Sequence, residues 1–203
     1  MQTKVVITGG PCAGKSSALS HIKACAEAHG YTVLTVAETA TELISGGVAP
    51  WTCASNAAYQ ACQMRLQIEK ERVFARAAEG MRAERILIVC DRGLMDNRAY
   101  MTGEDFDAVC AALHLTREDC LAEYDAVFHL CTAAKGAERF YTTANNQSRT
   151  ETPEEARRID DRLIEAWEGH PYHRIIGNEG SFADKMACLT RALEEFFARG
   201  EKA

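Results

Sequence analysis

Residues 5–17 read VVITGGPCAGKSS: an apolar run, then two glycines, and shortly afterwards a lysine with two serines. The segment from Gly9 to Ser16 fits the pattern G-x-x-x-x-G-K-[ST] of a phosphate-binding loop, the P-loop. Glycines let the backbone wrap closely around phosphates with its N–H groups pointing inward, and the helix that follows adds its positive dipole end. The alternative is a glycine-rich turn with a chance lysine.

We favour the P-loop because an apolar strand pattern precedes the loop and a helical pattern follows it. Lys15 is expected to reach the terminal phosphates, and the Ser16 hydroxyl is expected to ligate Mg²⁺. The chain is therefore predicted to bind a nucleoside triphosphate, ATP or GTP, together with Mg²⁺. The expected nucleotide-binding residues of this loop are Gly10, Pro11, Cys12, Ala13, Gly14, Lys15, Ser16 and Ser17.

Length and composition are those of an ordinary globular protein. The 203 residues, 47% hydrophobic and 26% charged, suffice for one domain with a real core, which we expect to cover residues 1–203. No apolar stretch is long enough for a bilayer and no signal-peptide pattern follows Met1, so we expect a cytoplasmic protein without a membrane partner. The formal net charge of −6 argues against a broad basic surface for nucleic acid, although a local basic pocket stays possible.

The nine cysteines are scattered and form no C-x-x-C pair, so a zinc site has little support. An odd count without a secretory signal fits a reducing cytosol, and we interpret most of these cysteines as small core residues.

Strand-like apolar runs alternate with helical stretches along the chain. Continuous apolar runs are typical of strands buried on both faces of a parallel sheet. The alternation predicts a three-layer α/β/α fold with a central five-stranded parallel sheet. Strands are expected at 5–8, 33–36, 86–90, 127–130 and 174–176. Helices are expected at about 15–28, 56–82, 106–113, 153–167 and 182–198.

The segment 133–150 is polar and long for a simple connection, which favours a functional loop such as a lid, with the lid region spanning about 133–168. It ends at a clear helix start, where Thr152 is followed by Pro153 and by Glu155 at the third helical position. Arginines in a lid can stabilise the charge that develops during phosphoryl transfer. Arg149 is the candidate we prefer, ahead of Arg139, Arg157 and Arg158; Arg157 or Arg158 could equally form a surface ion pair.

Two other strands end in acidic residues. Asp91 closes the run ILIVCD at a Walker-B-like position, where a carboxylate can hold Mg²⁺, and Arg92 could reach a phosphate or the acceptor in bidentate fashion. The alternative is a solvent-exposed charge pair. Glu38 follows the second strand, and the carboxyl ends of parallel strands face one crevice. Glu38 could accept a proton from an attacking hydroxyl, or it could merely cap the next helix.

Three further features are less decisive. Gln60, Gln63, Gln67 and Glu71 share one helix face beside Tyr59 and could read a base, but we favour a solvated helix face. Asn178 follows the fifth strand, where loops often pack against a nucleotide base. His170 and His173 have a metal-ligand spacing, but no third ligand is apparent nearby, so we interpret them as structural.

Together, the GGPCAGKSS loop, Glu38 and the VCDRG stretch resemble P-loop kinases of nucleosides and nucleotides. Deoxynucleoside and thymidylate kinases carry an acidic–arginine pair where Asp91 and Arg92 stand here. The chain is more similar to a family of kinase-like ATP/GTP-binding domains often labelled AAA-type, itself similar to the ribosylnicotinamide kinase domain of a bacterial regulator of NAD biosynthesis.

That resemblance rests also on SRTETPEEA at 148–156 and on the spaced set Asn178, Phe182 and Lys185, and it spans nearly the whole chain. It implies a kinase-like domain and leaves the substrate open. No glutamate follows Asp91, as motor ATPases usually require, and no N-K-x-D motif is present, which disfavours an ordinary GTPase.

The favoured interpretation is a small-molecule kinase whose catalytic residues are Lys15, Glu38, Asp91, Arg92 and Arg149, with Ser16 and Asp91 as metal ligands. Its acceptor would be a nucleoside or a nucleoside-like molecule such as nicotinamide riboside. The alternatives are a regulatory module that binds and slowly hydrolyses a nucleotide, and a hydrolase of the bound nucleotide. Base preference and oligomeric state stay open.

Overall fold

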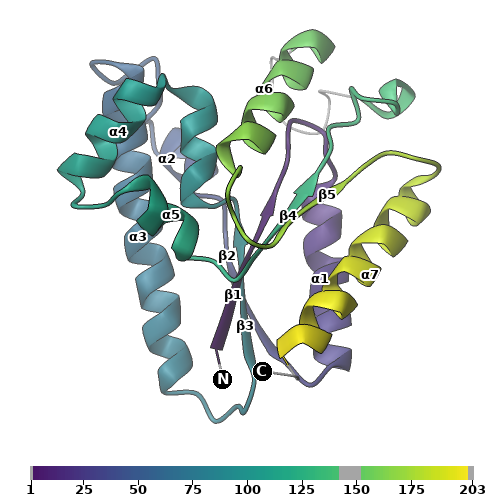
Figure 1. Ribbon diagram of the computed structural model, residues 1–203. Coiled ribbons are helices and arrows are strands. Elements are labelled where there is room, and N and C mark those ends of the chain that lie inside the picture. The colour runs from purple at the N-terminus through teal and green to yellow at the C-terminus, as the bar shows by residue number, and fades with distance from the viewer. Residues whose placement is uncertain (1, 142–151, 201–203) are drawn as a thin grey trace.

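The computed structural model describes residues 2–141 and 152–200, which build one five-stranded sheet with helices on both faces (Figure 1). The strand order is β2-β3-β1-β4-β5, and all neighbouring strands are parallel. The predicted α/β fold with a five-stranded parallel sheet is therefore confirmed. The strands are β1 (Gln2–Thr8), β2 (Thr32–Val36), β3 (Ile86–Asp91), β4 (Ala126–Leu130) and β5 (His173–Ile176).

Strand β1 lies at the centre because its residues are apolar on both faces. Val5, Val6 and Ile7 are completely buried, and successive side chains point to opposite faces of the sheet. Val5 and Ile7 join the core under one helical layer, and Val6 joins the core under the other. The edge strands β2 and β5 are only partly buried.

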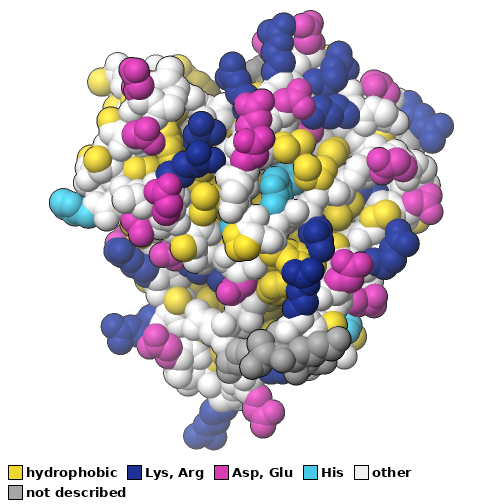
Figure 2. Space-filling view, viewed as in Figure 1, with side chains coloured by type: hydrophobic (Ala, Val, Ile, Leu, Met, Phe, Trp, Pro, Cys, Tyr) yellow, Lys and Arg dark blue, Asp and Glu magenta, His cyan; other side chains and the backbone are white. Residues whose placement is uncertain are grey.

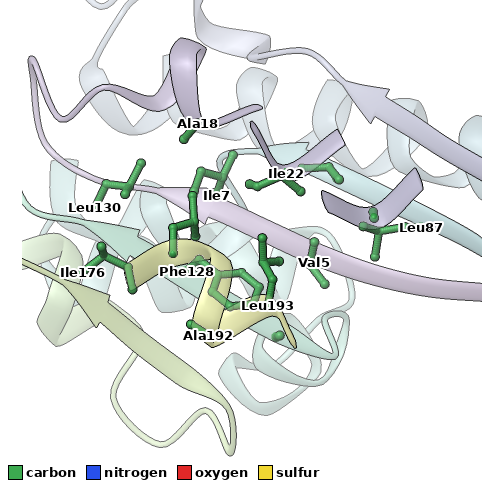
Figure 3. Packing of buried hydrophobic residues seen from close by; sticks show 14 of the residues in the cluster. Val5, Ile7, Ala18, Ile22, Leu87, Phe128, Leu130, Ile176, Ala192 and Leu193 are labelled. Atoms are coloured by element: carbon green, nitrogen blue, oxygen red, sulfur yellow. The ribbon is translucent and has the colours of Figure 1, made fainter. Parts of the chain in front are cut away.

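One layer consists of α1 (Lys15–Ala28) and α7 (Phe182–Gly200), which lie side by side against the sheet in Figure 1. The core beneath them is drawn in Figure 3 and includes Ile22 of α1, Leu193 of α7 and Phe128 of β4. The other face is covered mainly by α3 (Asn56–Glu79), α4 (Gly103–Ala112) and α5 (Arg117–Ala122). The three-layer arrangement matches the prediction.

Four further elements follow the carboxyl ends of strands or lie beyond them. These are α2 (Thr39–Ser45), the 3-10 helices η1 (Leu94–Tyr100) and η2 (Glu138–Phe140), and α6 (Pro153–Ala166). Helix α6 begins where the sequence predicts it: Thr152 Oγ1 accepts a bond from Glu155 N at 3.2 Å, and Thr152 N donates to Glu155 Oε2 at 2.7 Å. Figure 1 shows α6 beyond the carboxyl ends of the strands.

Several sequence expectations need adjustment. Helix α3 ends at Glu79 instead of residue 82, because Gly80 follows as its C-cap. Elements α2, α5 and η1 were not predicted, since elements of six or seven residues carry little periodicity. The interpretation of most cysteines as core residues holds for five of the nine: Cys90, Cys110 and Cys120 are buried in the core, and Cys25 and Cys188 are half-buried against it. Cys12, Cys53 and Cys131 are half-buried and Cys62 is exposed.

Charged side chains of both signs are mixed over the face seen in Figure 2, with several basic ones at the end of the molecule where α6 lies. Among the described residues, no helix combines the length and the apolar character that crossing a membrane requires.

Candidate active site

The loop between β1 and α1 has the backbone that its sequence predicts. Gly9, Cys12 and Gly14 all have positive φ values, of 146°, 57° and 88°. A Cβ atom on Gly9 would lie 2.1 Å from the carbonyl oxygen of Leu130, so only glycine fits there. Gly14 precedes α1 and has no side chain that could cap the first N–H groups of the helix, which leaves them to an anion. Lys15, in the first turn, is 9% exposed.

The sheet register brings Asp91 to the start of this loop. Ile7 of β1 is paired with Asp91 of β3, and the Arg92 amide donates to the Ile7 carbonyl oxygen at 3.0 Å. Arg92 has a φ of 74°, a left-handed conformation that is uncommon for a residue with a side chain. Strained backbone of this kind clusters at functional sites, and here it occurs directly after the strand that delivers the carboxylate.

Glu38 and Arg92 form an ion pair at the ends of β2 and β3. Arg92 Nε donates to Glu38 Oε1 at 2.5 Å, and Thr41 Oγ1 donates to Glu38 Oε2 at 2.7 Å. Burial opposes ionisation of Glu38, but the positive charges of Arg92 and Lys15 together lower the pKa of this carboxyl to about 2. Glu38 is the N-cap residue of α2 but makes no side-chain cap bond, so the capping alternative does not account for its carboxylate.

The pKa of Asp91 is shifted in the opposite direction, upward. Burial raises the pKa of Asp91, the charge of Lys15 lowers it, and the negative charge of Glu38 raises it again. Its Oδ1 atom is buried and has no hydrogen-bond partner within the described part of the chain. A buried carboxylate oxygen without a donor, in a residue that interacts electrostatically with Lys15 of the P-loop, suits Mg²⁺, which prefers carboxylate, hydroxyl and phosphate oxygens. Ser16, the other expected ligand, is exposed.

The amide row on α3 is buried, so its interpretation as a solvated helix face is wrong. Gln60, Gln63, Gln67 and Glu71 are between 3% and 7% exposed. Gln67 Nε2 donates to the Arg92 carbonyl oxygen at 3.2 Å and to Glu71 Oε1 at 3.0 Å. Through Gln67, the row therefore stabilises the backbone of the strained turn at Arg92. The signal in the sequence was the run of neutral amides itself, because solvated helix faces usually carry charges.

Four buried polar atoms near Glu38 or in the amide row lack a hydrogen-bond partner among residues 2–141 and 152–200. Tyr59 interacts electrostatically with Glu38, and burial together with that negative charge raises the pKa of Tyr59 to about 12. Native proteins rarely leave buried polar atoms unpaired, so such a group indicates a place for a ligand. The atoms are Tyr59 Oη, Gln60 Oε1, Asp91 Oδ1 and Arg92 Nη1.

Asn178 lies beside the P-loop, but its amide is already engaged. Asn178 Nδ2 donates to the carbonyl oxygens of Thr132 and Lys135, each at 2.7 Å, and its Oδ1 accepts from Lys185 Nζ at 2.7 Å. Lys185 Nζ also donates to the Ala13 carbonyl oxygen at 3.1 Å. Asn178 therefore positions the loop, and its side chain has no free donor with which to read a base.

A cavity of about 220 Å³ opens beside these residues. Its floor is the P-loop backbone at Cys12 and Ala13, and its rim includes Phe182, which is 47% exposed and packs against Gly14. An exposed aromatic ring at the mouth of such a cavity provides a stacking surface for a planar group.

The remaining candidates divide between described and undescribed residues. Arg149 lies at 142–151, outside the described residues, as do Asn145 and Asn146. Arg157 Nη1 donates to the Ala134 carbonyl oxygen at 2.9 Å, whereas Arg158 forms an exposed pair with Glu154 at 2.6 Å. Arg139 lies in η2.

Of the histidine pair, His170 has the structural contacts that the sequence analysis expects, whereas His173 Nε2 is buried without a hydrogen-bond partner among the described residues. His170 Nε2 contacts the Tyr124 carbonyl oxygen at 2.8 Å, and its Nδ1 accepts from Tyr172 N at 3.1 Å. A second group, His129, Cys131 and Asp160, places ligand-type atoms within 4.8 Å of one another. Asp160 Oδ1 lies 3.1 Å from His129 Nε2, and Asp160 Oδ2 forms an ion pair with Lys135 Nζ at 2.8 Å, so the carboxylate already has protein partners.

Comparisons with known proteins agree with this geometry. The sequence model of a family described as "AAA domain" matches residues 4–185. Curated proteins give no match. A structure of deoxyadenosine kinase from M. mycoides with bound dATP has a TM-score of 0.58 at 13% identity, over 95% of this chain and 99% of that chain. A second structure of that enzyme, with the products dCMP and a flexible dCDP, has a TM-score of 0.59 at 13% identity, over 95% and 100%. At this identity the likeness shows a shared deoxynucleoside-kinase-like P-loop fold.

Proposed function

The chain belongs to the AAA domain family, and we propose that it is a P-loop kinase that transfers the γ-phosphoryl group of Mg-ATP or Mg-GTP to a hydroxyl of a small nucleoside-like molecule. The observation that carries this proposal is the Glu38–Arg92 pair at the end of the sheet, within electrostatic reach of Lys15 and close to buried polar atoms that lack hydrogen-bond partners among the described residues. A protein that only held a nucleotide would not need this second set of polar groups beyond the phosphates.

The P-loop amides and Lys15 would hold the β- and γ-phosphates. Ser16 and Asp91 would hold Mg²⁺, which supplies charge neutralisation on the phosphate oxygens when it is bound. Arg92, whose Nη1 atom lies 4.0 Å from Asp96 Oδ2 and makes no hydrogen bond to the described residues, would contact the phosphoryl oxygens or the acceptor. Arg149 is proposed as a further contact to the transferred group.

In the reaction, a new bond forms between the acceptor oxygen and the γ-phosphorus, the bond to the leaving nucleoside diphosphate breaks, and the acceptor hydroxyl loses its proton to Glu38. Glu38 would first accept a hydrogen bond from the attacking hydroxyl. A carboxylate with a pKa of about 2 is a weak base, so its main contribution is to orient the hydroxyl, and it takes the proton late in the step, when the acceptor oxygen has become acidic, and then releases it to solvent.

The acceptor would lie against Tyr59 and Gln60. The unpaired Gln60 Oε1 atom accepts a hydrogen bond and the unpaired Tyr59 hydroxyl can donate one. An acceptor that carries both an amine or amide N–H and a hydrogen-bond acceptor satisfies these atoms, which is the chemistry of a nucleobase or of a carboxamide. Nicotinamide riboside and the deoxynucleosides both qualify.

The test is the release of ADP or GDP from Mg-ATP and Mg-GTP with and without a panel of acceptors: nicotinamide riboside, deoxyadenosine and deoxycytidine. We expect one acceptor to raise the rate by at least roughly 10²-fold over the reaction with water, with phosphorylated acceptor identified by mass spectrometry. If no acceptor changes the slow background rate, the regulatory-module alternative replaces the kinase.

Two variants sharpen this test. Lys15→Ala should abolish both turnover and tight nucleotide binding. Glu38→Gln should keep nucleotide binding while transfer falls roughly 10²- to 10⁴-fold. Glu42→Gln, in the next turn of α2, is the matched control because Glu42 is 60% exposed and pairs with Lys70. Equal transfer by Glu38→Gln and the unmodified protein would show that Glu38 has no role in the chemistry.

A further inference from the structure

Asp160 of α6 joins the P-loop to two neighbouring segments, although nothing in the sequence marks it. Its side chain is completely buried. Asp160 Oδ1 accepts from the Gly10 amide at 2.9 Å and from the Thr132 amide at 3.0 Å, and it lies 3.1 Å from His129 Nε2. Asp160 Oδ2 lies 2.8 Å from Lys135 Nζ. One carboxylate thus connects α6, the P-loop and the end of β4.

This contact explains why position 10 is glycine. Gly10 does not have a positive φ, so its backbone conformation is open to other residues. A Cβ atom at this position would lie 2.9 Å from Asp160 Oδ1, which is closer than real Cβ atoms come, and 3.0 Å from Asp160 Cβ, which is tighter than most real contacts. The close approach of the carboxylate therefore requires glycine here.

A buried negative charge under a loop that binds phosphates is unfavourable unless it is compensated. Burial opposes its ionisation, but the bonds from His129, Lys135 and Gly10 lower the pKa of Asp160 to about 2, so the carboxylate is charged at neutral pH. The charge has a structural consequence at the P-loop. A charged acceptor binds an amide N–H more strongly than a neutral acceptor does, so the ionised Asp160 holds the Gly10 amide firmly.

Other contacts immobilise the same loop further along. Thr132 Oγ1 donates to the Pro11 carbonyl oxygen at 2.5 Å, and Lys185 Nζ donates to the Ala13 carbonyl oxygen. Side chains from other segments thus bind the P-loop backbone at Gly10, Pro11 and Ala13, and Asp160 binds it at the first of these positions.

We propose that Asp160 is a positioning residue that fixes the Gly10 peptide, holds the P-loop in the shape that binds the β-phosphate, and so connects α6 to the nucleotide site. This inference rests on nucleotide binding at the P-loop and is independent of the acceptor.

The experiment compares Asp160→Asn with Asp161→Asn. The two residues are adjacent and both contact Lys135, but Asp161 is 61% exposed and lies 2.6 Å from Lys135 Nζ on the outer side. Each variant is titrated with N-methylanthraniloyl-ADP in the presence of Mg²⁺, at a temperature where circular dichroism shows it to be folded. Both the Kd and the number of binding sites per molecule are fitted.

We expect Asp160→Asn to raise the Kd at least tenfold at full stoichiometry, and Asp161→Asn to change it less than twofold. Competition by AMP, which has no β-phosphate, should differ little between the variants. A merely structural role would reduce the number of sites and leave the Kd unchanged, and that result would overturn the proposal.

If Asp160→Asn does not fold, Gly10→Ala displaces the carboxylate instead, and an unchanged Kd in that variant also overturns the proposal. Failure of the unmodified protein to bind the labelled ADP removes the premise and overturns it as well. Binding without transfer to any acceptor would refute the kinase proposal alone.

Discussion

Replacement of Glu38 by Gln removes one charge of the ion pair with Arg92 and keeps the size of the side chain. The side chains of Arg92 and Glu38 are 14% and 26% exposed, so solvent screens the pair only in part. In the folded protein the pKa of Glu38 is lowered from 4.5 to about 2. A shift of about 2.5 units corresponds to about 3 kcal/mol, since each unit contributes about 1.4 kcal/mol.

The effect has a defined pH dependence. Because the pKa is lower in the folded state, Glu38 stabilises the protein above its unfolded-state pKa of 4.5, and the stabilisation is lost as the pH falls toward about 2. Glu38→Gln should therefore reduce the free energy of unfolding by about 3 kcal/mol at pH 7 and by roughly half that amount at pH 3.

The measurement is urea unfolding of both proteins at pH 7, 5, 4 and 3 and constant ionic strength, with equal m-values as the condition for comparison. Glu27→Gln is the control, since Glu27 is 53% exposed and lies 3.9 Å from Lys23. Its effect should stay below about 0.5 kcal/mol at every pH. A difference for Glu38→Gln below about 0.5 kcal/mol at pH 7, or one that is the same at pH 7 and pH 3, would refute the reasoning.

Three further predictions concern stability and metal. Asp91→Asn should raise the unfolding free energy of the metal-free protein by about 1 kcal/mol, because it removes a buried charge whose Oδ1 has no donor among the described residues. It should also raise the Mg²⁺ concentration for half-maximal turnover at least roughly tenfold. Unfolding without metal and a Mg²⁺ titration test these two effects, and a destabilised variant would contradict the first. Thr152→Ala should cost about 1 kcal/mol in urea unfolding through loss of the bond from Glu155 N, and no change would show that this cap is dispensable. Phe128→Ala should cost about 3–5 kcal/mol, because Phe128 is completely buried between the sheet and α7, and a cost below about 1 kcal/mol would mean that the cavity collapses.

Local features could be predicted from the sequence because neighbouring residues determine them. The glycine pattern determines the P-loop backbone, the order of Thr152, Pro153 and Glu155 determines the start of α6, and the apolar runs determine five strands. Asp91 and Glu38 could be placed at one edge because parallel strands end on the same side of a sheet.

The tertiary structure alone decided which polar side chains are buried and what they contact. The amide row on α3 reads as a solvated face until β3 and η1 cover it, and Asn178 reads as a base contact until Lys185 and two carbonyl oxygens occupy its amide. Asp160 meets Gly10 across 150 positions of sequence. Periodicity and motifs report on neighbours along the chain, whereas a contact over that separation depends on the packing of whole elements, and no local pattern encodes it.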